Sequence, residues 1–165
     1  MTIEKIDHAL DDLDLRILEQ MQADSALTNQ ELALRVHASA PTCLRRVRRL
    51  IEAGVIEKQV AIVNPNKVAS SLTAIIEITL DIQTTEHLDA FEAGISRAPA
   101  ILQCYRVSPG PDFIVVAQVA DMPAYHAMAH QMFTSHANVR NVRSFFSIHR
   151  SKFETRVVLP GQRAS

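Results

Sequence analysis

Hydrophobic residues recur at helical spacing in the N-terminal third of the chain. The first such pattern covers residues 11–21 and places Leu13, Ile17, Leu18 and Met21 on one side of a helix. Aspartates occupy its first turn, where the positive end of the helix dipole stabilises negative charge. The pattern predicts an N-terminal helix that forms the back wall of a small helical unit.

A second helix is predicted to begin at a capping box. In this motif the Thr28 side chain accepts a hydrogen bond from the Glu31 amide, and the Glu31 side chain reaches back to the Thr28 amide. Leu32 and Val36 then give the helix an apolar face. Two residues separate Val36 from the next capping residue, so the connection to the following helix is short.

The third helix is predicted to begin at the capping residue Ser39, with Pro41 tolerated in the first turn because its missing N–H has no helical partner. Its apolar stripe comprises Leu44, Val47, Leu50 and Ile51. The rest of its surface holds four arginines and no acid, and comprises Thr42, Arg45, Arg46, Arg48 and Arg49. We expect the arginines to face outward together.

Two helices joined by so short a turn form a helix-turn-helix, whose second helix enters the major groove of DNA. The alternative is a solvated arginine-rich face, although such faces usually mix both signs of charge. The candidates for contacts at or near the bases are Ser39, Thr42, Arg45 and Arg46, and those for phosphates are Arg48, Arg49 and Lys58. We expect a dimer to read successive major grooves of a pseudo-palindrome in double-stranded DNA.

After the third helix the sequence pattern changes twice, first from helical to β-rich and then to a break in regular structure. Gly54 offers a left-handed helix stop, and the β-rich pattern over Val55–Val63 predicts a short hairpin or wing. Asn64-Pro65-Asn66 interrupts regular structure and marks a boundary. The expected organisation is a DNA-binding domain at residues 1–63, a linker at 64–72, a second domain at 73–150 and a tail at 151–165.

The second domain shows six alternating elements. Strands are predicted at 73–80, 102–108, 113–119 and 139–148, and helices at 85–97 and 123–135. The order βαββαβ is that of a ferredoxin-like α+β sandwich, in which two helices cover one face of a four-stranded sheet. Because the other face stays open with apolar residues on it, we expect a homodimer.

Composition and charge limit the size of the core, the distribution of positive potential and the expected location of the protein. With 165 residues, 47% of them hydrophobic, the chain can bury two small cores. The net charge of −1 requires any positive potential to be local, and we expect the basic face of the first domain to meet phosphate while the acidic first helix faces elsewhere. No apolar run approaches the length of about 20 residues that a membrane span needs, and the acidic N-terminus lacks the basic start and apolar core typical of a signal peptide. We therefore expect a cytoplasmic protein without a membrane partner. Cys43 and Cys104 stand apart and are expected to be free thiols.

Three other functions fit the sequence less well. A transition metal could be held by histidines at the spacing of His126, His130 and His136. No acid or cysteine joins them in the sequence, so a solvated, partly charged helix edge is favoured. Catalysis is disfavoured because the chain has no glycine-rich phosphate loop and no nucleophile motif, so no cofactor is expected. An effector-sensing partner without DNA binding conflicts with the helix-turn-helix pattern.

Specific motifs carry a family likeness. They are Leu13-Asp14-x-x-Ile17-Leu18, Leu32-x-x-Arg35-Val36, the run 43–50, Gly54-Val55-Ile56, Asn64-Pro65, Glu77-Ile78-Thr79-Leu80, Asp121-Met122-x-x-Tyr125 and Val139-x-x-Val142-x-Ser144. Together they closely resemble the Lrp/AsnC transcription regulators, the leucine-responsive and asparagine-responsive feast-or-famine proteins. The resemblance implies a winged helix-turn-helix, a βαββαβ effector domain, dimers that assemble into octamers, and an amino acid or related small molecule bound between subunits.

The family's effector loop, usually Gly-Asp-x-Asp, is replaced here by residues 108–112, in which only Asp112 matches. Prolines occupy two of these positions and lack an N–H, so the amides of Ser108, Gly110 and Asp112 remain as donors for a ligand carboxylate. The Asp112 carboxylate can hold an α-ammonium group. The alternative is that Asp112 only caps a tight turn.

Residues of the last strand resemble those that line the family's effector cleft, with Met122 opposite them. Phe145 and Phe146 suit an apolar or aromatic ligand side chain. Because adjacent strand residues point to opposite faces, at most one of the two phenylalanines is expected to reach the ligand.

Overall fold

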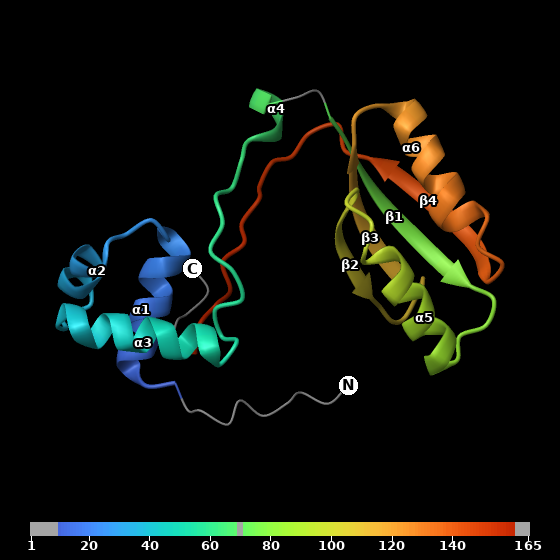
Figure 1. Cartoon of the computed structure of the whole chain (residues 1–165). Coiled ribbons are helices and arrows are strands. Elements are labelled where there is room, and N and C mark those ends of the chain that lie inside the picture. The colour runs from blue at the N-terminus through green and yellow to red at the C-terminus, as the bar shows by residue number, and fades with distance from the viewer. Residues whose placement is uncertain (1–9, 69–70, 161–165) are drawn as a thin grey trace. The chain divides into compact units, whose positions relative to one another are not determined.

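The computed structural model describes residues 10–68 and 71–160 and divides the chain into two compact units. The first unit combines Met1–Ile62 with Lys152–Ser165, and the second is Val63–Ser151 (Figure 1). The C-terminal tail therefore belongs to the same unit as the N-terminal helices. None of the helices in the described ranges is long and apolar enough to cross a membrane.

Three helices form the first unit, and each begins at a side chain that satisfies a free amide of its first turn. Their bounds are α1 Asp12–Ala23, α2 Asn29–Arg35 and α3 Ala40–Glu52. The capping residues are Asp11, Thr28 and Ser39. The predicted capping box at Thr28 and the predicted helix start at Ser39 are confirmed, and α1 has a second capping box formed by Asp11 and Asp14.

The core of the first unit is apolar and includes one residue of the tail. Its buried members are Ile17, Leu18, Leu32, Ala33, Val36, Cys43, Leu50 and Leu159. The side-chain amide of Gln22 on α1 donates to the carbonyl of Val157 and accepts from its amide, at 3.3 and 2.7 Å. The tail is thus fastened to α1 by hydrogen bonds and by burial of Leu159.

The buried face of α3 differs from the predicted stripe. Cys43 and Leu50 are buried, whereas Leu44 and Ile51 are 43% and 44% exposed. Cys43 and Leu50 lie seven positions apart, which is two helical turns, so they share a face that the packing of α1 and α2 against α3 selects. The predicted stripe is therefore correct for Leu50 and for Val47, which packs against the same core, and wrong for Leu44 and Ile51.

The predicted hairpin over Val55–Val63 is also wrong for the single chain. Gly54 does end α3 with a left-handed φ of +70°, but residues 57–64 carry no helix or strand. Val60, Ile62 and Val63 are more than 60% exposed, because no neighbouring strand supplies the backbone pairing that a β-ladder needs.

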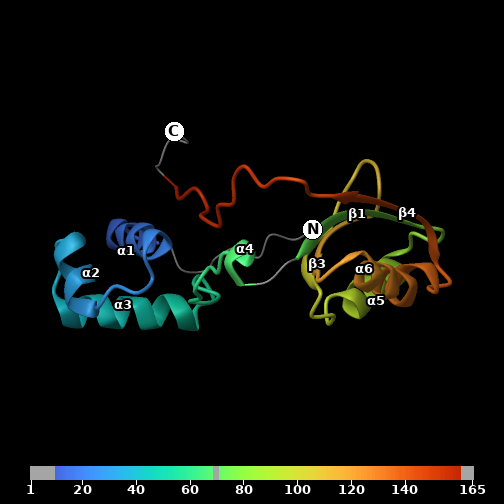
Figure 2. The same ribbon diagram turned by 90° about the horizontal axis from the view of Figure 1, so that it is seen from above.

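The second unit has the predicted βαββαβ order. After the short helix α4 (Pro65–Val68), its elements are β1 Leu72–Leu80, α5 Thr85–Ile95, β2 Ile101–Arg106, β3 Phe113–Val119, α6 Met122–Ala129 with a π-helical extension η1 His130–Thr134, and β4 Val139–Phe146. The sheet order is β2-β3-β1-β4, and every pair is antiparallel. Figure 2 shows α5 and α6 on the same face of this sheet. The ferredoxin-like prediction is confirmed.

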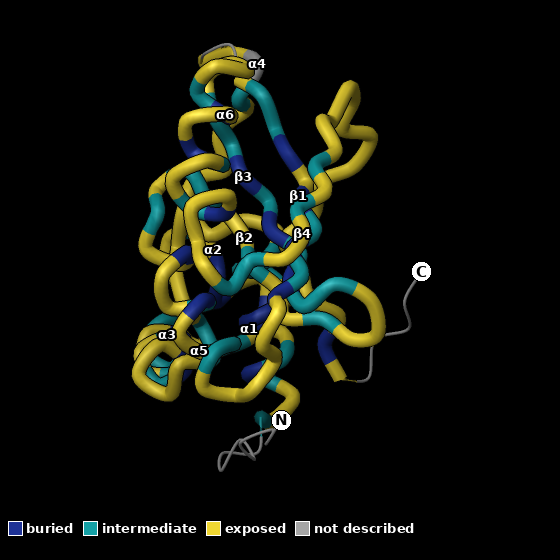
Figure 3. Tube along the Cα trace, turned by 90° about the vertical axis from the view of Figure 1, so that its right-hand side faces the viewer, coloured by how far each residue is buried: buried dark blue, intermediate teal, exposed yellow. Residues whose placement is uncertain are grey.

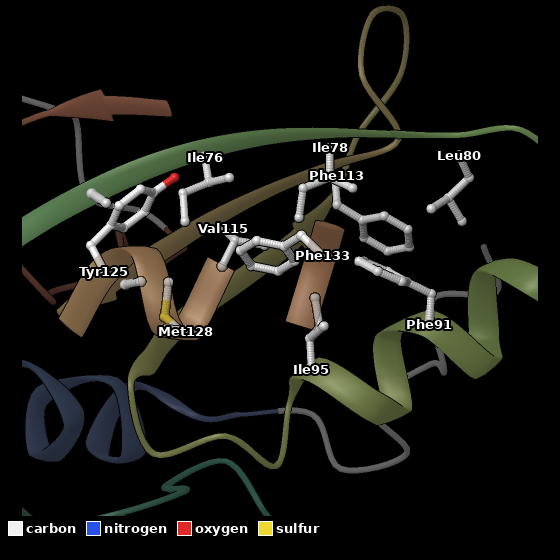
Figure 4. Close-up of a cluster of buried hydrophobic side chains, with 12 residues drawn as sticks. Ile76, Ile78, Leu80, Phe91, Ile95, Phe113, Val115, Tyr125, Met128 and Phe133 are labelled. Carbon is white, nitrogen blue, oxygen red and sulfur yellow. The ribbon is translucent and has the colours of Figure 1, made fainter. Parts of the chain in front are cut away.

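Alternation along the strands places the core on the helix side. Ala74, Ile76, Ile78 and Leu80 of β1 are fully buried, and buried and partly exposed positions alternate along β1 and β3 (Figure 3). Figure 4 shows these side chains meeting the aromatic and aliphatic residues of α5, α6 and η1. The sheet and its helices thus enclose one continuous core.

The opposite face of the sheet is not covered within the second unit. Ile75 pairs with Val116 on one side and with Phe145 on the other, so all three side chains point to this face. Ile75 and Phe145 are 41% and 45% exposed, and Tyr105 adds a further exposed ring. We name the surface formed by Ile75, Tyr105, Val116 and Phe145 the open sheet face.

Candidate functional site

The recognition helix α3 begins with a polar pair. The Ser39 hydroxyl accepts a hydrogen bond from the Thr42 amide, and the two hydroxyl groups lie 2.8 Å apart. Asn29 of α2 donates to the carbonyl of Ala40 at 2.6 Å and so ties the start of α3 to α2. The two helices of the helix-turn-helix are therefore joined by a side-chain bond as well as by their turn.

Arg45 and Arg48 are exposed, as predicted. Neither forms an ion pair with any residue in the described ranges. They lie three positions apart and so project from the same side of α3, opposite its buried face. Lys58 is also exposed, in the irregular segment after α3.

Arg46 and Arg49 do not face outward, and here the prediction is wrong. Nη1 of Arg46 lies 2.5 Å from Oδ2 of Asp11 and 3.2 Å from Oδ1 of Asp14, and Arg49 pairs with the buried Asp14. The bond to Asp11 raises the pKa of Arg46 above its usual value.

These ion pairs follow from which face of α3 is buried. Because Cys43 and Leu50 are the buried positions, Arg46 and Arg49 border the buried face and lie next to α1. Burial also raises the pKa of the Cys43 thiol, which disfavours the reactive thiolate. The arginine-rich helix thus has one outward pair and one inward pair.

The candidate effector loop, residues 108–112, is anchored by Asp112. Oδ2 of Asp112 accepts hydrogen bonds from the Leu80 amide at 2.7 Å and from the Gln83 side chain at 3.1 Å. Its amide donates to the Ile78 carbonyl, so this predicted donor is already used. The turn-capping interpretation thus describes one carboxylate oxygen, while Oδ1 has no hydrogen bond to the residues described here.

Other parts of the loop are free to contact a ligand. Ser108 and Gly110 are exposed, and no hydrogen bond from their amides is found within the described chain. Gly110 has φ +123°, a conformation that side-chain-bearing residues rarely adopt. The loop therefore presents two backbone donors beside the Asp112 carboxylate.

The two phenylalanines of β4 lie on opposite faces, as predicted. Phe146 packs edge-on against Tyr125, with ring centroids 4.9 Å apart, and the Tyr125 hydroxyl bonds to Ser144. Phe145 lies on the open sheet face, with the Arg143 guanidinium 5.4 Å from its ring centroid. The aromatic cluster on the helix side is therefore separate from Phe145.

One chain does not bring the candidate effector residues together. Asp112 binds the end of β1 at Leu80, whereas Phe146 pairs with Ala74 near its start. At about 3.3 Å per residue, the six positions between Leu80 and Ala74 correspond to roughly 20 Å. Met122 follows β3 directly, at the same end as Phe146. The loop and the cluster thus occupy opposite ends of the sheet.

The histidines do not form a metal centre in the residues described. His136 packs edge-on against Phe91 and His126 against Tyr125. No group of three potential metal-ligating side chains is found in residues 10–68 and 71–160.

Sequence reasoning missed four residues that shape these sites. They are Asp11 and Asp14, which bind the arginines of α3, Gln83, which binds Asp112, and Tyr125, which contacts Phe146. The acidic pair has a signal, because its three-residue spacing at a helix start is that of a capping box. The other two contacts depend on tertiary packing alone.

The fold and the two sites define a class of protein: a DNA-binding helix-turn-helix regulator with a separate ligand domain. Residues 10–57 match the winged helix-turn-helix DNA-binding family, and residues 73–157 match the Lrp/AsnC ligand binding domain. The two matches leave only a short connecting segment between them.

Related sequences agree with these matches. The leucine-responsive regulatory protein of Rhizobium meliloti is 36% identical over 143 residues, which cover 87% of this chain and 92% of that protein. The leucine-responsive regulatory protein of Escherichia coli K12 is 31% identical over 150 residues, which cover 91% of this chain and 92% of that protein.

Solved structures agree as well. A transcriptional regulator of Neisseria meningitidis in complex with L-methionine matches with a TM-score of 0.83 and 30% identity, over 92% of this chain and 98% of that one. A feast or famine regulatory protein of M. tuberculosis complexed with L-methionine matches with a TM-score of 0.80 and 28% identity, over 92% and 100%. The chain belongs to the Lrp/AsnC family of helix-turn-helix transcription regulators.

Proposed function

We propose that this regulator works as a homodimer whose effector, an amino acid, binds between subunits. The observation that carries the proposal is the separation of the Asp112 loop from Phe146 and Met122 by the length of β1. A second copy of the chain supplies the missing half of each site. A ligand held in this way changes DNA occupancy if it binds the assembly states unequally.

The open sheet face supports the dimer. Ile75, Val116 and Phe145 form an apolar strip that no helix of their own unit covers. A contiguous exposed apolar patch marks an interaction surface in a water-soluble domain. Pairing of two open sheet faces buries these side chains, and further contacts between dimers build the octamer that the family likeness implies.

The chemistry of the site supports an amino acid with an apolar side chain. The Asp112 Oδ1 oxygen suits an α-ammonium group, and the amides of Ser108 and Gly110 suit a carboxylate. Phe146 and Met122, or Phe145 from the open sheet face, offer contacts for the ligand side chain. The L-methionine complexes of the two related structures and the leucine-responsive relatives support the same class of ligand.

DNA contacts are proposed for the outward side of α3. Arg45, with the polar pair Ser39 and Thr42 at the helix start, is the candidate for base contacts. Arg48 and Lys58 are the candidates for phosphates. The protein acts by binding rather than by catalysis and needs no cofactor, and its DNA ligand implies a cytoplasmic site of action.

A thermal-shift screen against the common amino acids tests the effector proposal. Selective stabilisation is expected for an apolar amino acid, because a ligand that binds only the folded state raises its stability. Asp112→Ala is expected to abolish the shift. Gln83→Ala is the matched control, since it removes one bond to Oδ2 but keeps the carboxylate. A shift that survives in Asp112→Ala, or no shift with any amino acid, contradicts the proposal.

A further inference from the structure

Two acidic side chains of α1 reach the recognition helix of their own unit. Asp11 and Asp14 both contact Nη1 of Arg46, at 2.5 and 3.2 Å, and Asp14 also pairs with Arg49. Two carboxylates therefore face two guanidinium groups. Half of the positive charge of α3 is neutralised inside the protein.

The Asp14 carboxylate is held in place by its burial. It is the one fully buried charged side chain among the residues that the structure describes. Both oxygens accept hydrogen bonds from Arg46, and Oδ2 also accepts from Arg49 and from the Asp11 amide. A buried carboxylate that loses its cation is strongly unfavourable. A DNA phosphate that drew Arg46 or Arg49 away would remove one of the two cations that compensate this buried charge.

Arg45 and Arg48 provide the contrast on the same helix. Both are exposed, and neither pairs with an acid anywhere in residues 10–68 and 71–160. A phosphate meets no internal competitor at these two positions. The four arginines thus carry the same formal charge, but only Arg45 and Arg48 can bind a phosphate without first leaving a carboxylate.

We propose that Asp11 and Asp14 withhold Arg46 and Arg49 from DNA, so that α3 presents two arginines rather than four. The proposal rests on DNA binding through α3. Phosphate contacts supply binding that is independent of sequence, and each steepens the dependence of log K on log salt by about 0.9. Withholding two cations per subunit therefore weakens binding to random DNA and leaves a larger share of the affinity to base contacts.

The first test compares arginines on the two sides of α3. Binding of the full chain to a random-sequence DNA duplex is measured by fluorescence anisotropy between about 50 and 200 mM KCl. Arg48→Ala is expected to flatten the salt slope by about 0.9 per subunit, and Arg46→Ala by less than about 0.3. An equal flattening by the two variants overturns the proposal.

The second test weakens the hold on Arg46 without removing the arginine. Asp11→Asn keeps a good helix-capping side chain but removes one of the two carboxylate charges that pair with Arg46, and leaves Asp14 as the other. Asp12→Asn is the matched control, because Asp12 is an exposed neighbour with the same formal charge and no arginine partner among the described residues. Asp11→Asn is expected to steepen the slope by up to about 0.9 per subunit more than Asp12→Asn. Identical slopes for the two variants overturn the proposal.

A folding control separates structural damage from loss of charge. Arg46→Ala and Asp11→Asn leave the pair between Arg49 and Asp14 intact, so both are expected to stay folded in thermal unfolding. Arg49→Ala is included only as a further comparison, because it leaves the buried Asp14 with Arg46 as its one remaining arginine partner in the described residues. Wild-type protein that fails to bind the duplex contradicts DNA binding itself, whereas equal slopes contradict only the withholding.

Discussion

The two sites of this molecule are built in opposite ways. The DNA-binding side of α3 is positioned within one chain, by the Ser39 cap, the Asn29 bond to α2 and the ion pairs to α1. The effector residues of one chain lie at opposite ends of β1. Under the proposed function, the DNA-binding site is complete in the monomer, and the effector site is completed by a second copy of the chain. Changes inside the first unit should therefore act locally, and changes on the open sheet face should act on assembly.

The largest expected effect comes from Asp14→Ala. This change removes the buried carboxylate that accepts hydrogen bonds from Arg46, Arg49 and the Asp11 amide, and loss of hydrogen bonding to a charged group costs about 1.5–3 kcal/mol. Chemical unfolding of the first unit reports the loss. Asp12→Ala, at an exposed neighbouring position, should stay within about 0.5 kcal/mol of wild type. Equal stability of the two variants would show that the ion pairs do not support the unit.

A smaller effect on stability but a clear one on assembly is expected from Ile75→Glu. The change places a charge in the apolar strip of the open sheet face and should weaken dimerisation at least about 100-fold, which corresponds to about 2.8 kcal/mol. Sedimentation equilibrium measures it. Ala90→Glu adds the same charge at an exposed position of α5 and should leave the dimer intact. A dimer that survives Ile75→Glu would place the interface elsewhere.

Helix capping gives a change of about 1 kcal/mol. Thr28→Ala removes the hydroxyl that accepts from the Glu31 amide, and loss of such a cap typically costs about this much. Thr84→Ala at the start of α5 is the natural comparison, because Thr84 makes no side-chain capping bond. Thermal unfolding should show a larger loss for Thr28→Ala, and the reverse order would contradict the local account of α2.

The smallest expected effect is a dependence on pH. The side-chain hydrogen bond from Thr28 holds the pKa of Glu31 below its usual value of 4.5. A lowered pKa gives stability that is present above 4.5 and is lost as the pH falls through the folded value. Thermal unfolding between about pH 6 and 3 should therefore show a shallower decline for Thr28→Ala than for wild type. An identical decline in the two proteins would show that the Glu31 carboxylate does not contribute to the loss of stability at low pH.

Local signals predicted most of the fold. The Thr28 and Ser39 caps, the Gly54 stop and the six elements of the second unit follow from patterns that a few neighbouring residues define. The buried face of α3 does not, because Leu44 is more hydrophobic in a sequence pattern than Cys43 and only packing against α1 and α2 decides between them. The choice of buried face also decides that Arg46 and Arg49 lie next to α1 and pair with its aspartates.

The candidate effector site was predictable only in part. The resemblance to the family's effector loop indicated Asp112, and strand alternation indicated that Phe145 and Phe146 lie on opposite faces. The distance between the loop and Phe146 depends on how β1 and β4 pair, which no local pattern contains. The prediction of a hairpin after Gly54 is wrong for a similar reason. A strand needs a pairing partner, and no strand pairs with this segment in the described residues.

Ligand binding by a monomeric variant tests the central claim most directly. Isothermal titration with L-leucine and L-methionine compares wild-type protein with Ile75→Glu, after sedimentation has shown which assembly each forms. The account predicts binding of at least one amino acid by the wild-type assembly and none by folded monomeric Ile75→Glu. Binding of the same amino acid by the monomer with unchanged affinity would contradict it, because the effector site would then be complete in one chain.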